Sequence, residues 1–530
     1  MIAVRVATGR DVPAIREIFM ASYGTDYTDT RYYDDAQLTR LVYSDSSLLL
    51  VVDEVETGRV IGTASVDFEV GADSDLVGEF GRLAVHPDFR QRGVAKLLME
   101  ERLSRVQHRL QVGLVEARVA HPYSVRIAEA HQFALVGFFP LRWQLRARES
   151  LAWLVRHFGN ALELRKNHPR IIPEACPLAD MAFENCSLTP DAIVDEHAPA
   201  YPPGGSFAVQ ELTTEGYAAL LRIERGRVHH REIFGPTRLH HGIFKLQALH
   251  STYLIARDAG MIAGAIGFTH DPGDQAIRVF ELISLRDEVI RPLLSHLERS
   301  CRETWGSSHI EVDVSAHAPR MQRTLVELGF LPVAYVPALV FHHVERLDVV
   351  KMVRLLIPPV VSTDAFPPRT KALADLVLRP FRNRSVLPRI AQAVQELSLF
   401  SGLDEEQVNR LAGVCRVATF ESGEIIFREG EQSDGMHLVL EGQVGVRIAK
   451  SGSAVGTVQK GECLGEISLL THDCHSATAT ALTTVETAVL EHRDLVELIR
   501  LRPDIGLLIY RNLATGLGEK LRRTSLSLPI

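Results

Sequence analysis

Short apolar runs separated by amphipathic stretches mark the first 145 residues, a pattern that predicts strands alternating with helices. Five strands are predicted, at Val4–Thr8, Ser47–Asp53, Arg59–Phe68, Phe80–Val85 and Val115–Ala120. Arg10-Asp11-Val12-Pro13 predicts a helix start, because proline is favoured early in a helix. The expected fold class is therefore α/β (α+β), a mixed sheet with flanking helices.

The same pattern returns between residues 203 and 345. Strands expected at Ser206–Leu212, Tyr253–Ala256, Ile262–Phe268 and Phe280–Leu285 mirror those of the first part. The ends match best, because Phe133–Pro140 corresponds to Phe330–Pro337, which follows a helix expected at Arg320–Leu328. The repeat predicts a second, related unit, with an unrelated α/β domain as the alternative.

The remaining segments have a different character. Leu151–Leu164 is helical in pattern, and residues 168–203 are rich in proline and acidic residues, which is typical of an ordered connector. From Leu397 the apolar runs become short and are punctuated by glycine, as in Phe420–Phe427 and Met436–Val444. This change predicts a β-roll, followed by terminal helices at Leu495–Arg500 and Pro503–Lys520.

Composition narrows the class of protein. The 530 residues exceed what one hydrophobic core serves, and a net charge of −8 argues against a nonspecific nucleic-acid binder. Six scattered cysteines without a Cys-x-x-Cys pair indicate free thiols in a reducing cytoplasm. We find no signal segment and no apolar run near the roughly 20 residues of a membrane helix, so a cytoplasmic protein is expected.

Three pairs of adjacent histidines suggest a metal site at first sight: His229-His230, His240-His241 and His342-His343. Neighbours on a strand point to opposite faces, so such pairs make poor shared ligands. No supporting cysteine or acid spacing accompanies them, and no metal is expected.

Candidate chemistry begins at Arg90-Gln91-Arg92-Gly93-Val94-Ala95, which follows the strand at Phe80–Val85 and opens a helix near Gly93. Small residues let backbone N–H groups approach a ligand, and a helix N-terminus binds anions such as a diphosphate. Arg90, Gly93 and Ala95 match the coenzyme A loop of the GNAT (GCN5-related) N-acetyltransferase family, which this region resembles. The resemblance implies acetyl-CoA as co-substrate. It also implies that the coenzyme-binding residues are Leu83, Val85, Arg90, Gln91, Arg92, Gly93, Val94 and Ala95.

The second unit resembles a GNAT fold that has lost this loop. After Leu285 the chain reads Arg286-Asp287-Glu288-Val289-Ile290-Arg291-Pro292, without a glycine and with two acids where a diphosphate needs donors. We therefore expect tandem GNAT folds, of which the second is degenerate and has a structural role or helps to form the acceptor cleft.

The residues for acid–base chemistry are less well marked. Glu79 stands where the histone-acetylating branch of the family places its catalytic glutamate; a solvated strand end is the alternative. The position of the family's catalytic tyrosine is Ala128, and the family's asparagine is His121. Tyr123 and His131 are the remaining candidates for supplying a proton.

The C-terminal part, from about residue 395, resembles the cyclic-nucleotide-binding domain of the catabolite activator and protein kinase A regulatory families. The resemblance implies binding residues in the cassette around Gly465, Glu466, His475 and Ser476. The family's Pro-Arg pair is here Cys474-His475, and neutral histidine lacks the bidentate guanidinium that holds the phosphate. This departure favours a domain without cyclic nucleotide binding; weak binding and ordinary cAMP or cGMP sensing are the alternatives.

The predicted organisation has five segments. They are a GNAT domain at 1–145, a helical connector at 146–202, a degenerate GNAT-like domain at 203–345, linker helices at 346–394 and a cyclic-nucleotide-binding-like domain at 395–530. The expected function is a bacterial acyl-CoA-dependent N-acyltransferase, acting on a protein lysine or a small amine, with a C-terminal regulatory domain. The alternative is a non-enzymatic acyl-CoA or cyclic-nucleotide sensor or scaffold.

Partners follow from the same features. No helix-turn-helix is visible after the β-roll, which counts against a transcription regulator, and no membrane contact is expected. The long helix at Ile505–Leu521 is a candidate surface for a homodimer.

Overall fold

The computed structural model describes residues 2–68, 75–205, 207–212, 231–235, 251–394, 401–433, 435–448, 454–466 and 474–527. The chain divides into an N-terminal unit, Met1–Leu378, and a C-terminal unit, Arg379–Ile530. Expectations at Ser206, Thr213–Glu215, Leu397 and Ile467–Leu470 lie outside the described residues. No helix in the described ranges is long and apolar enough to cross a membrane.

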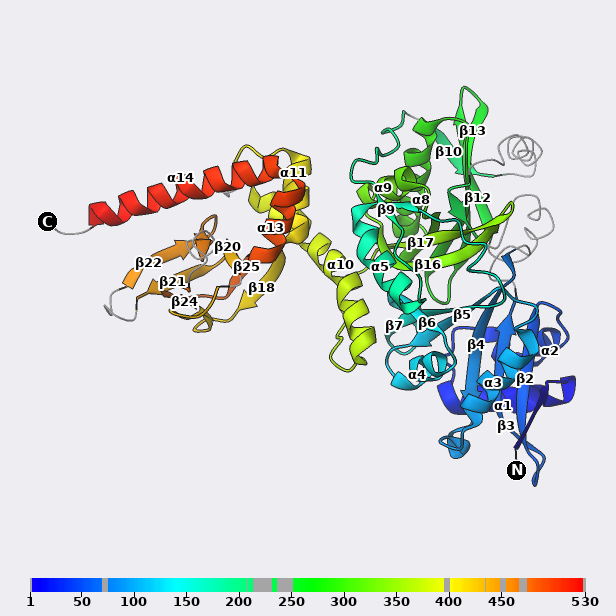
Figure 1. Ribbon diagram of the computed structural model, residues 1–530. Coiled ribbons are helices and arrows are strands. Elements are labelled where there is room, and N and C mark those ends of the chain that lie inside the picture. The colour runs from blue at the N-terminus through cyan, green and yellow to red at the C-terminus, as the bar shows by residue number, and fades with distance from the viewer. Residues whose placement is uncertain are drawn as a thin grey trace. The chain divides into compact units, whose positions relative to one another are not determined.

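One 15-stranded sheet runs through the described part of the N-terminal unit (Figure 1). Its first half has the order β1 (Ile2–Val6), β2 (Ser47–Glu54), β3 (Arg59–Asp67), β4 (Val77–Val85), β5 (Val112–Arg118), β7 (Arg148–His157) and β6 (Ala134–Gln144). Its second half runs from the far edge as β10 (Ala208–Glu211), β12 (Ser251–Asp258), β13 (Met261–Asp271), β14 (Ala276–Ser284), β15 (His309–Ser315), β17 (Glu345–Leu355) and β16 (Leu331–His342).

The two halves have the same strand order, which confirms the internal repeat. We call residues 2–157 the first copy and residues 208–355 the second copy. In both, an antiparallel meander leads to a parallel pair, β4 with β5 and β14 with β15, and the last hairpin inserts its second strand beside that pair. The tandem GNAT arrangement expected from the sequence is therefore present.

Helices cover the sheet of each copy. The first copy has η1 (Gly9–Asp11), α1 (Val12–Tyr23), η2 (Thr30–Tyr33), α2 (Asp35–Val42), η4 (Pro87–Phe89), α3 (Val94–Val106) and α4 (Pro122–Ala130). In the second copy the described elements are η7 (Asp287–Val289), α8 (Ile290–Glu303) and α9 (Pro319–Glu327), and a short strand β11 (Ile233–Phe234) pairs beside β15. Buried residues of α1 pack on one face of the first sheet and those of α3 on the other.

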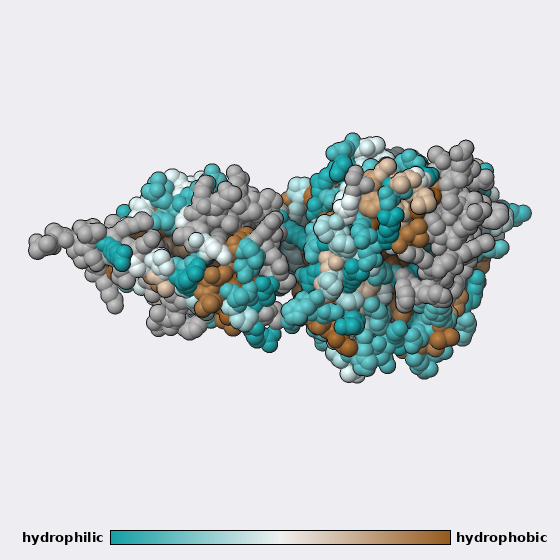
Figure 2. All heavy atoms as spheres, turned by 90° about the horizontal axis from the view of Figure 1, so that it is seen from above, coloured by the Kyte–Doolittle hydropathy of each residue, from teal (hydrophilic) through white to brown (hydrophobic). Residues whose placement is uncertain are grey.

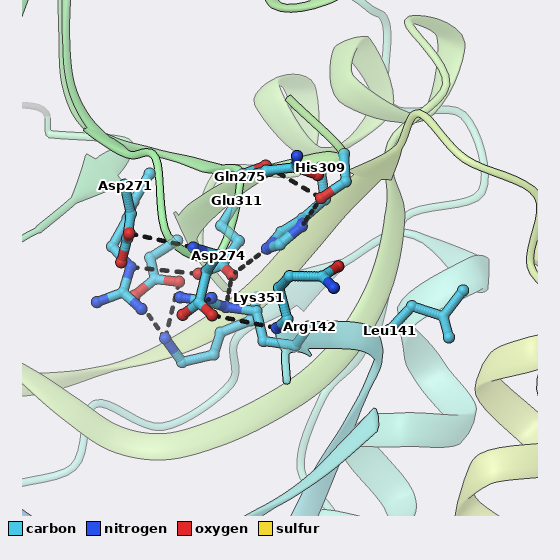
Figure 3. A network of polar contacts seen from close by, with 12 residues as sticks. Leu141, Arg142, Asp271, Asp274, Gln275, His309, Glu311 and Lys351 are labelled. Atoms are coloured by element: carbon cyan, nitrogen blue, oxygen red, sulfur yellow. Dashed lines mark hydrogen bonds and ion pairs between the residues drawn. The ribbon is translucent and has the colours of Figure 1, made fainter. Parts of the chain in front are cut away.

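The copies meet where β6 pairs with β16, at Gly137 and Ala334. A Cβ atom on Gly137 would lie 2.1 Å from the Cβ of Ala334, so only glycine permits this approach. Beside this joint, buried polar groups from both copies gather around Arg142, which is ion-paired with Asp274 and Glu311 (Figure 3). Burying such a group is tolerated because its charges are paired.

One helical expectation is wrong, and a second is met only in its later part. Leu151–Leu164 begins as β7, whose residues Leu151–Val155 are all buried, and the start of the segment expected to hold linker helices is β17. A strand buried on both faces has a continuous apolar sequence, which periodicity cannot distinguish from a buried helix. Helix does follow later, as α10 (Pro368–Val394). The domain boundaries stay predictions.

The connector between the copies is ordered. It contains β8 (Arg170–Ile171), η5 (Pro173–Ala175), α5 (Cys176–Asn185) and β9 (Ile193–Val194). Helix α5 packs against β6 and β16, so it covers the joint between the copies. On the face seen in Figure 2, the N-terminal unit is mostly hydrophilic with small hydrophobic areas.

The C-terminal unit is a β-roll of two four-stranded sheets with helices on either side in sequence. Its elements are α11 (Glu405–Val414), β18 (Arg416–Phe420), β19 (Ile425–Phe427), β20 (Gly435–Glu441), β21 (Gln443–Arg447), β22 (Ala454–Gln459), β23 (Cys463–Leu464), β24 (Thr478–Ala481), β25 (Val485–Glu491), α13 (His492–Leu501) and α14 (Pro503–Ser527). Ile505, Ile509 and Leu513 of α14 are buried in the same core as β20 and β25.

Candidate active site in the first copy

The first copy opens between β4 and β5. The two strands pair at Val77–Val112, Gly78–Gly113 and Glu79–Leu114, where the parallel ladder ends, while β4 continues to Val85 along β3. A bulge lies in the part of β4 beyond the ladder, and Arg82 there has a φ of 51°. Backbone groups of β4 past Glu79 therefore face a gap instead of a strand.

A cavity of about 1040 Å³ lies in the first copy. Its lining comes from the end of α1, the end of β4, the turn into α3, the start of α4 and the turn between β6 and β7. Of the predicted coenzyme residues, seven line it: Leu83, Val85, Arg90, Gln91, Gly93, Val94 and Ala95. A cavity of this size suits a large ligand such as a nucleotide coenzyme.

The turn into α3 has the geometry of an anion site. Gly93 is the N-cap residue, with a φ of 77° that favours glycine, and no atom beyond its immediate chain neighbours lies within 4 Å of where its Cβ would be. The thirteen-residue helix α3 directs its first N–H groups toward this end. Lys96 also lines the cavity; sequence reasoning missed it, although a lysine in the first turn of the helix was a signal.

Arg92 is placed differently from its neighbours. Its guanidinium lies 3.5 Å from Glu54 and 4.9 Å from the ring centre of Phe89, and it is not among the described residues that line the cavity. Its role in coenzyme binding stays a prediction.

The three predicted catalytic residues are not brought together. Tyr123 lines the cavity from the first turn of α4 and is 67% exposed. Glu79 is bound by Arg82 at 2.9 Å, and Arg82 also contacts Asp67. His131 contacts the carbonyl of Ile127 through Nδ1 at 2.7 Å, and neither it nor Glu79 is among the described lining residues.

Two ion pairs in the cavity wall were missed by sequence reasoning. Arg118 on β5 donates two hydrogen bonds to Glu149 on β7, at 2.7 and 2.6 Å. Arg146, in the turn before β7, donates to Asp26 at 2.6 Å. The partners of each pair are far apart in sequence. Arg118 and Glu149 meet because β7 pairs with β5, which no local sequence pattern indicates.

Glu116 is a second carboxylate near the opening that the sequence did not mark. It lies on β5 two residues beyond the last β4–β5 pair and is half-buried. Burial and the charge of Glu79 raise the pKa of Glu116 to about 7, although Arg142 and Arg278 oppose the shift.

The matching gap in the second copy is filled by the chain itself. Ile233 and Phe234 of β11 pair antiparallel with Val314 and Asp313 of β15. A Cβ on the next residue, Gly235, would lie 2.3 Å from the Cβ of Phe280 on β14, so the segment is pressed against both strands. The gap that stays open beside β4 in the first copy is thus occupied by β11 in the second copy.

In the β-roll, the residues predicted for the nucleotide cassette lie near one another. His475 is buried, and its ring stacks on Phe427 with centres 3.9 Å apart. A Cβ on Gly465, whose φ is 77°, would lie 3.4 Å from that ring. Glu466 is buried and Ser476 is exposed. The imidazole thus packs flat on an aromatic ring where the related families have a guanidinium.

Comparison with known proteins agrees with both architectures. The model of the GNAT acetyltransferase family matches residues 12–133, and that of the cyclic nucleotide-binding domain matches residues 417–502. The chain therefore contains a GNAT acetyltransferase domain and a cyclic nucleotide-binding domain.

Individual relatives cover only part of the chain. A cyclic AMP receptor protein of Thermus thermophilus is 32% identical over 25% of this chain and 61% of its own length. A cAMP-dependent protein kinase regulatory subunit of Yarrowia lipolytica is 31% identical over 18% of this chain and 26% of its own. Among solved structures, a putative phosphinothricin N-acetyltransferase matches 30% of this chain and 99% of its own, with 21% identity and a TM-score of 0.28.

No group of three or more His, Cys, Asp and Glu side chains among the described residues is arranged to hold a metal ion.

Proposed function

We propose that the first copy transfers an acetyl group from acetyl-CoA to the amine of a protein lysine or a small molecule. The observation that carries the proposal is the cavity of about 1040 Å³ whose wall combines the N-terminus of α3 with the end of β4. The first would hold the coenzyme's diphosphate, and N–H groups of the second would orient the pantetheine arm and polarise the thioester. Holding thioester and amine together supplies much of the rate.

The test is release of free CoA from acetyl-CoA in the presence of an amine panel: the free amino acids, polyamines and a lysine peptide. We expect turnover with one class of amine. Tight acetyl-CoA binding without CoA release for any amine would favour the alternative, a non-enzymatic acyl-CoA sensor. The ion pair of Glu79 with Arg82 and the alanine at position 128 are the observations in favour of that alternative.

We propose a regulatory role for the β-roll, with cAMP or cGMP as the candidate effector. The guanidinium-to-imidazole change at His475 makes weak binding or none the expected result. Calorimetric titrations with both nucleotides at pH 6 and pH 8 test this, and flat titrations throughout would exclude a nucleotide-gated protein.

Two further parts of the proposal concern the cellular compartment and the oligomeric state. The six cysteines form no disulfide, which supports a reducing, cytoplasmic compartment. Leu507 and Tyr510 are exposed apolar residues on α14, which supports a homodimer formed through this helix. Analytical ultracentrifugation of the wild type and of the variant L507E tests the second point.

A further inference from the structure

A fully buried arginine, Arg102 on α3, contacts the backbone of the first copy's sheet. It is 1% exposed, and its Nη1 donates hydrogen bonds to the carbonyl oxygens of Ser65 on β3, at 3.0 Å, and of Gly81 on β4, at 3.1 Å. Among the described residues no carboxylate pairs with this guanidinium, and burial lowers its pKa. An unpaired buried charge costs stability, so the arginine is an expensive choice for a core position.

The other contacts of Arg102 are weaker. Its Nη2 lies 3.4 Å from the sulfur of Met99, and its guanidinium lies 5.5 Å from the ring centre of Phe80. Its Nε has no hydrogen-bond partner in the part of the chain that the structure describes. The two backbone carbonyls are therefore the main partners of the charge.

These two carbonyls lie at the bulge of β4. The ladder between β3 and β4 shifts between Thr63 and Ser65, and Ser65 with Gly81 is the last regular pair of β4 before the shift. The residues of β4 that follow, 83–85, line the cavity. Arg102 belongs to α3, whose N-terminus forms another part of the cavity wall. It thus joins the helix that carries the anion site to the strand that borders the gap.

The second copy supplies a comparison for this position. Gly62 on β3 pairs with the last residue of β4, and Gly264 on β13 pairs with the last residue of β14, so the two glycines are equivalent. A Cβ atom on Gly62 would lie 3.5 Å from Leu98 of α3, and one on Gly264 would lie 3.4 Å from Leu293 of α8. The two leucines therefore occupy the same place on their helices.

Leu297 corresponds to Arg102, because each follows its leucine by four residues, about one helical turn. Leu297 is fully buried, so packing of the helix on the sheet does not require a guanidinium there. The bulge of the second copy lies three residues past its glycine, after Gly267, whereas that of the first copy lies one residue past its glycine, after Thr63. The arginine thus occurs in the copy that has the large cavity, beside the bulge that precedes the cavity wall.

We propose that Arg102 is a positioning residue of the first copy, which holds the bulge of β4 in the shape that acetyl transfer needs; this inference rests on the proposed function. Arg102 is not among the described residues that line the cavity, so it acts through the backbone and not on the substrate. Binding the carbonyls of Ser65 and Gly81 fixes β4 just before the segment whose N–H groups would polarise the thioester. A displacement of about 1 Å in such a group can lower a rate about 100-fold.

The experiment replaces Arg102 by the residue of the second copy, Arg102→Leu. Urea unfolding is expected to give the same midpoint or a higher one, since an apolar side chain replaces an unpaired buried charge. We expect kcat for CoA release to fall about 30-fold, because the bulge loosens. Calorimetric affinity for acetyl-CoA should change less than about threefold, since Gly93 and the start of α3 are untouched. A packing role predicts the reverse, a lower midpoint with kcat retained.

Hydrogen exchange followed by mass spectrometry measures the bulge directly and needs no enzymatic activity. A peptide covering Phe80–Val85 is expected to exchange at least about tenfold faster in Arg102→Leu than in wild type, because its backbone loses a buried donor. Peptides from β2 and β5, which Arg102 does not contact through any hydrogen bond among the described residues, should exchange at the wild-type rate.

The matched control is Arg105→Leu on the same helix. Arg105 is exposed and pairs with Glu101 at 2.7 Å, so its loss should leave kcat and the exchange of β4 unchanged. Arg102→Lys keeps the charge but lacks the planar fork, and it should lower kcat about fivefold with intermediate exchange. If Arg102→Leu fails to fold, this variant decides the question, since wild-type kcat and exchange in it would overturn the proposal.

The outcomes separate this inference from the proposed function. If wild type transfers acetyl groups and Arg102→Leu keeps its kcat, Arg102 does not serve the reaction, whatever the exchange of β4. A lower kcat with unchanged exchange would overturn the route through the bulge. If wild type transfers to no amine, the proposed function fails and the role in transfer fails with it, whereas the exchange of β4 still shows whether Arg102 holds the bulge.

Discussion

The two copies of the N-terminal unit share one strand order but differ in what lies between their parallel strands. In the first copy the gap beyond Glu79 leads to a cavity of about 1040 Å³, and in the second copy β11 pairs into the gap. The N-cap of α3 in the first copy is Gly93, whereas in the second copy Asp287 and Glu288 lie in η7, immediately before α8, and the N-cap is Val289. A duplicated fold can therefore lose ligand binding through two separate changes. Its anion site can change, and its own backbone can fill the gap between the parallel strands.

The largest expected effect of this difference is on the number of acetyl-CoA molecules that one chain binds. We expect isothermal titration calorimetry to give one acetyl-CoA bound per chain, because β11 occupies the second gap and two acids stand at its helix start. A stoichiometry of two would contradict the comparison, since it requires β11 to leave β15.

The variant Glu311→Gln, at the joint between the copies, is expected to lower the free energy of unfolding of the N-terminal unit. Burial opposes ionisation of Glu311, but the charges of Arg142 and Arg278 and the contact with His309 hold its pKa well below the usual range. A depressed pKa contributes stability above the ordinary value of about 4.3, and this stability is lost as pH falls through the lower folded value. We expect the variant to lose about 3 kcal/mol at pH 7 and less at pH 4.

Urea unfolding followed by tryptophan fluorescence measures this loss, because Trp143, Trp153 and Trp305 all lie in the N-terminal unit. The control is Glu327→Gln, which removes an exposed partner of Arg291 and should cost less than about 1 kcal/mol. Equal losses for the two variants would show that the buried group does not bind the copies together.

The anion site of the first copy is tested by Gly93→Asp. A carboxylate at the start of α3 repels a diphosphate, and a φ of 77° strains any residue with a Cβ. We expect acetyl-CoA affinity to fall about 100-fold, or about 2.7 kcal/mol, in calorimetry.

The matched control lies in the second copy. Gly306 has a φ of 57° and open space around its Cβ position, as Gly93 has. Gly306→Asp should therefore cost similar stability and leave acetyl-CoA affinity unchanged. If both variants weaken binding alike, the effect of Gly93→Asp comes from strain alone.

The smallest expected effect concerns the β-roll. There the departure from the related families is one side chain, at His475, whereas in the second copy a strand fills the gap. His475→Arg restores a bidentate donor, so we expect cAMP affinity to rise about tenfold or more, equivalent to about 1.4 kcal/mol. His475→Lys supplies charge without the fork and should gain less. No gain with arginine would mean that the side chain at position 475 is not what limits nucleotide binding to the β-roll.

Sequence reasoning succeeded where the signal was local. The small residues at Gly93 and Ala95, the repeated ends Phe133–Pro140 and Phe330–Pro337, and the glycine-punctuated β-roll each carry their own pattern. It failed at Leu151–Leu164, because a doubly buried strand and a buried helix have similar apolar sequences.

The candidate site was harder to predict, because strand pairing brings its residues together from distant parts of the sequence and no local motif contains them. Arg118 and Glu149, for example, meet only because β5 pairs with β7. A two-residue strand such as β11 is too short for any periodicity.

The insertion of β7 between β5 and β6 has a practical consequence for anyone dissecting the protein. A fragment ending at residue 145 would lack β7, whose residues start at Arg148, and would leave β5 and β6 with unsatisfied neighbouring edges. Such edges recruit strands from other molecules, so the truncated fragment is expected to aggregate. Useful truncations must end beyond His157, and they still uncover the β6 edge that β16 protects.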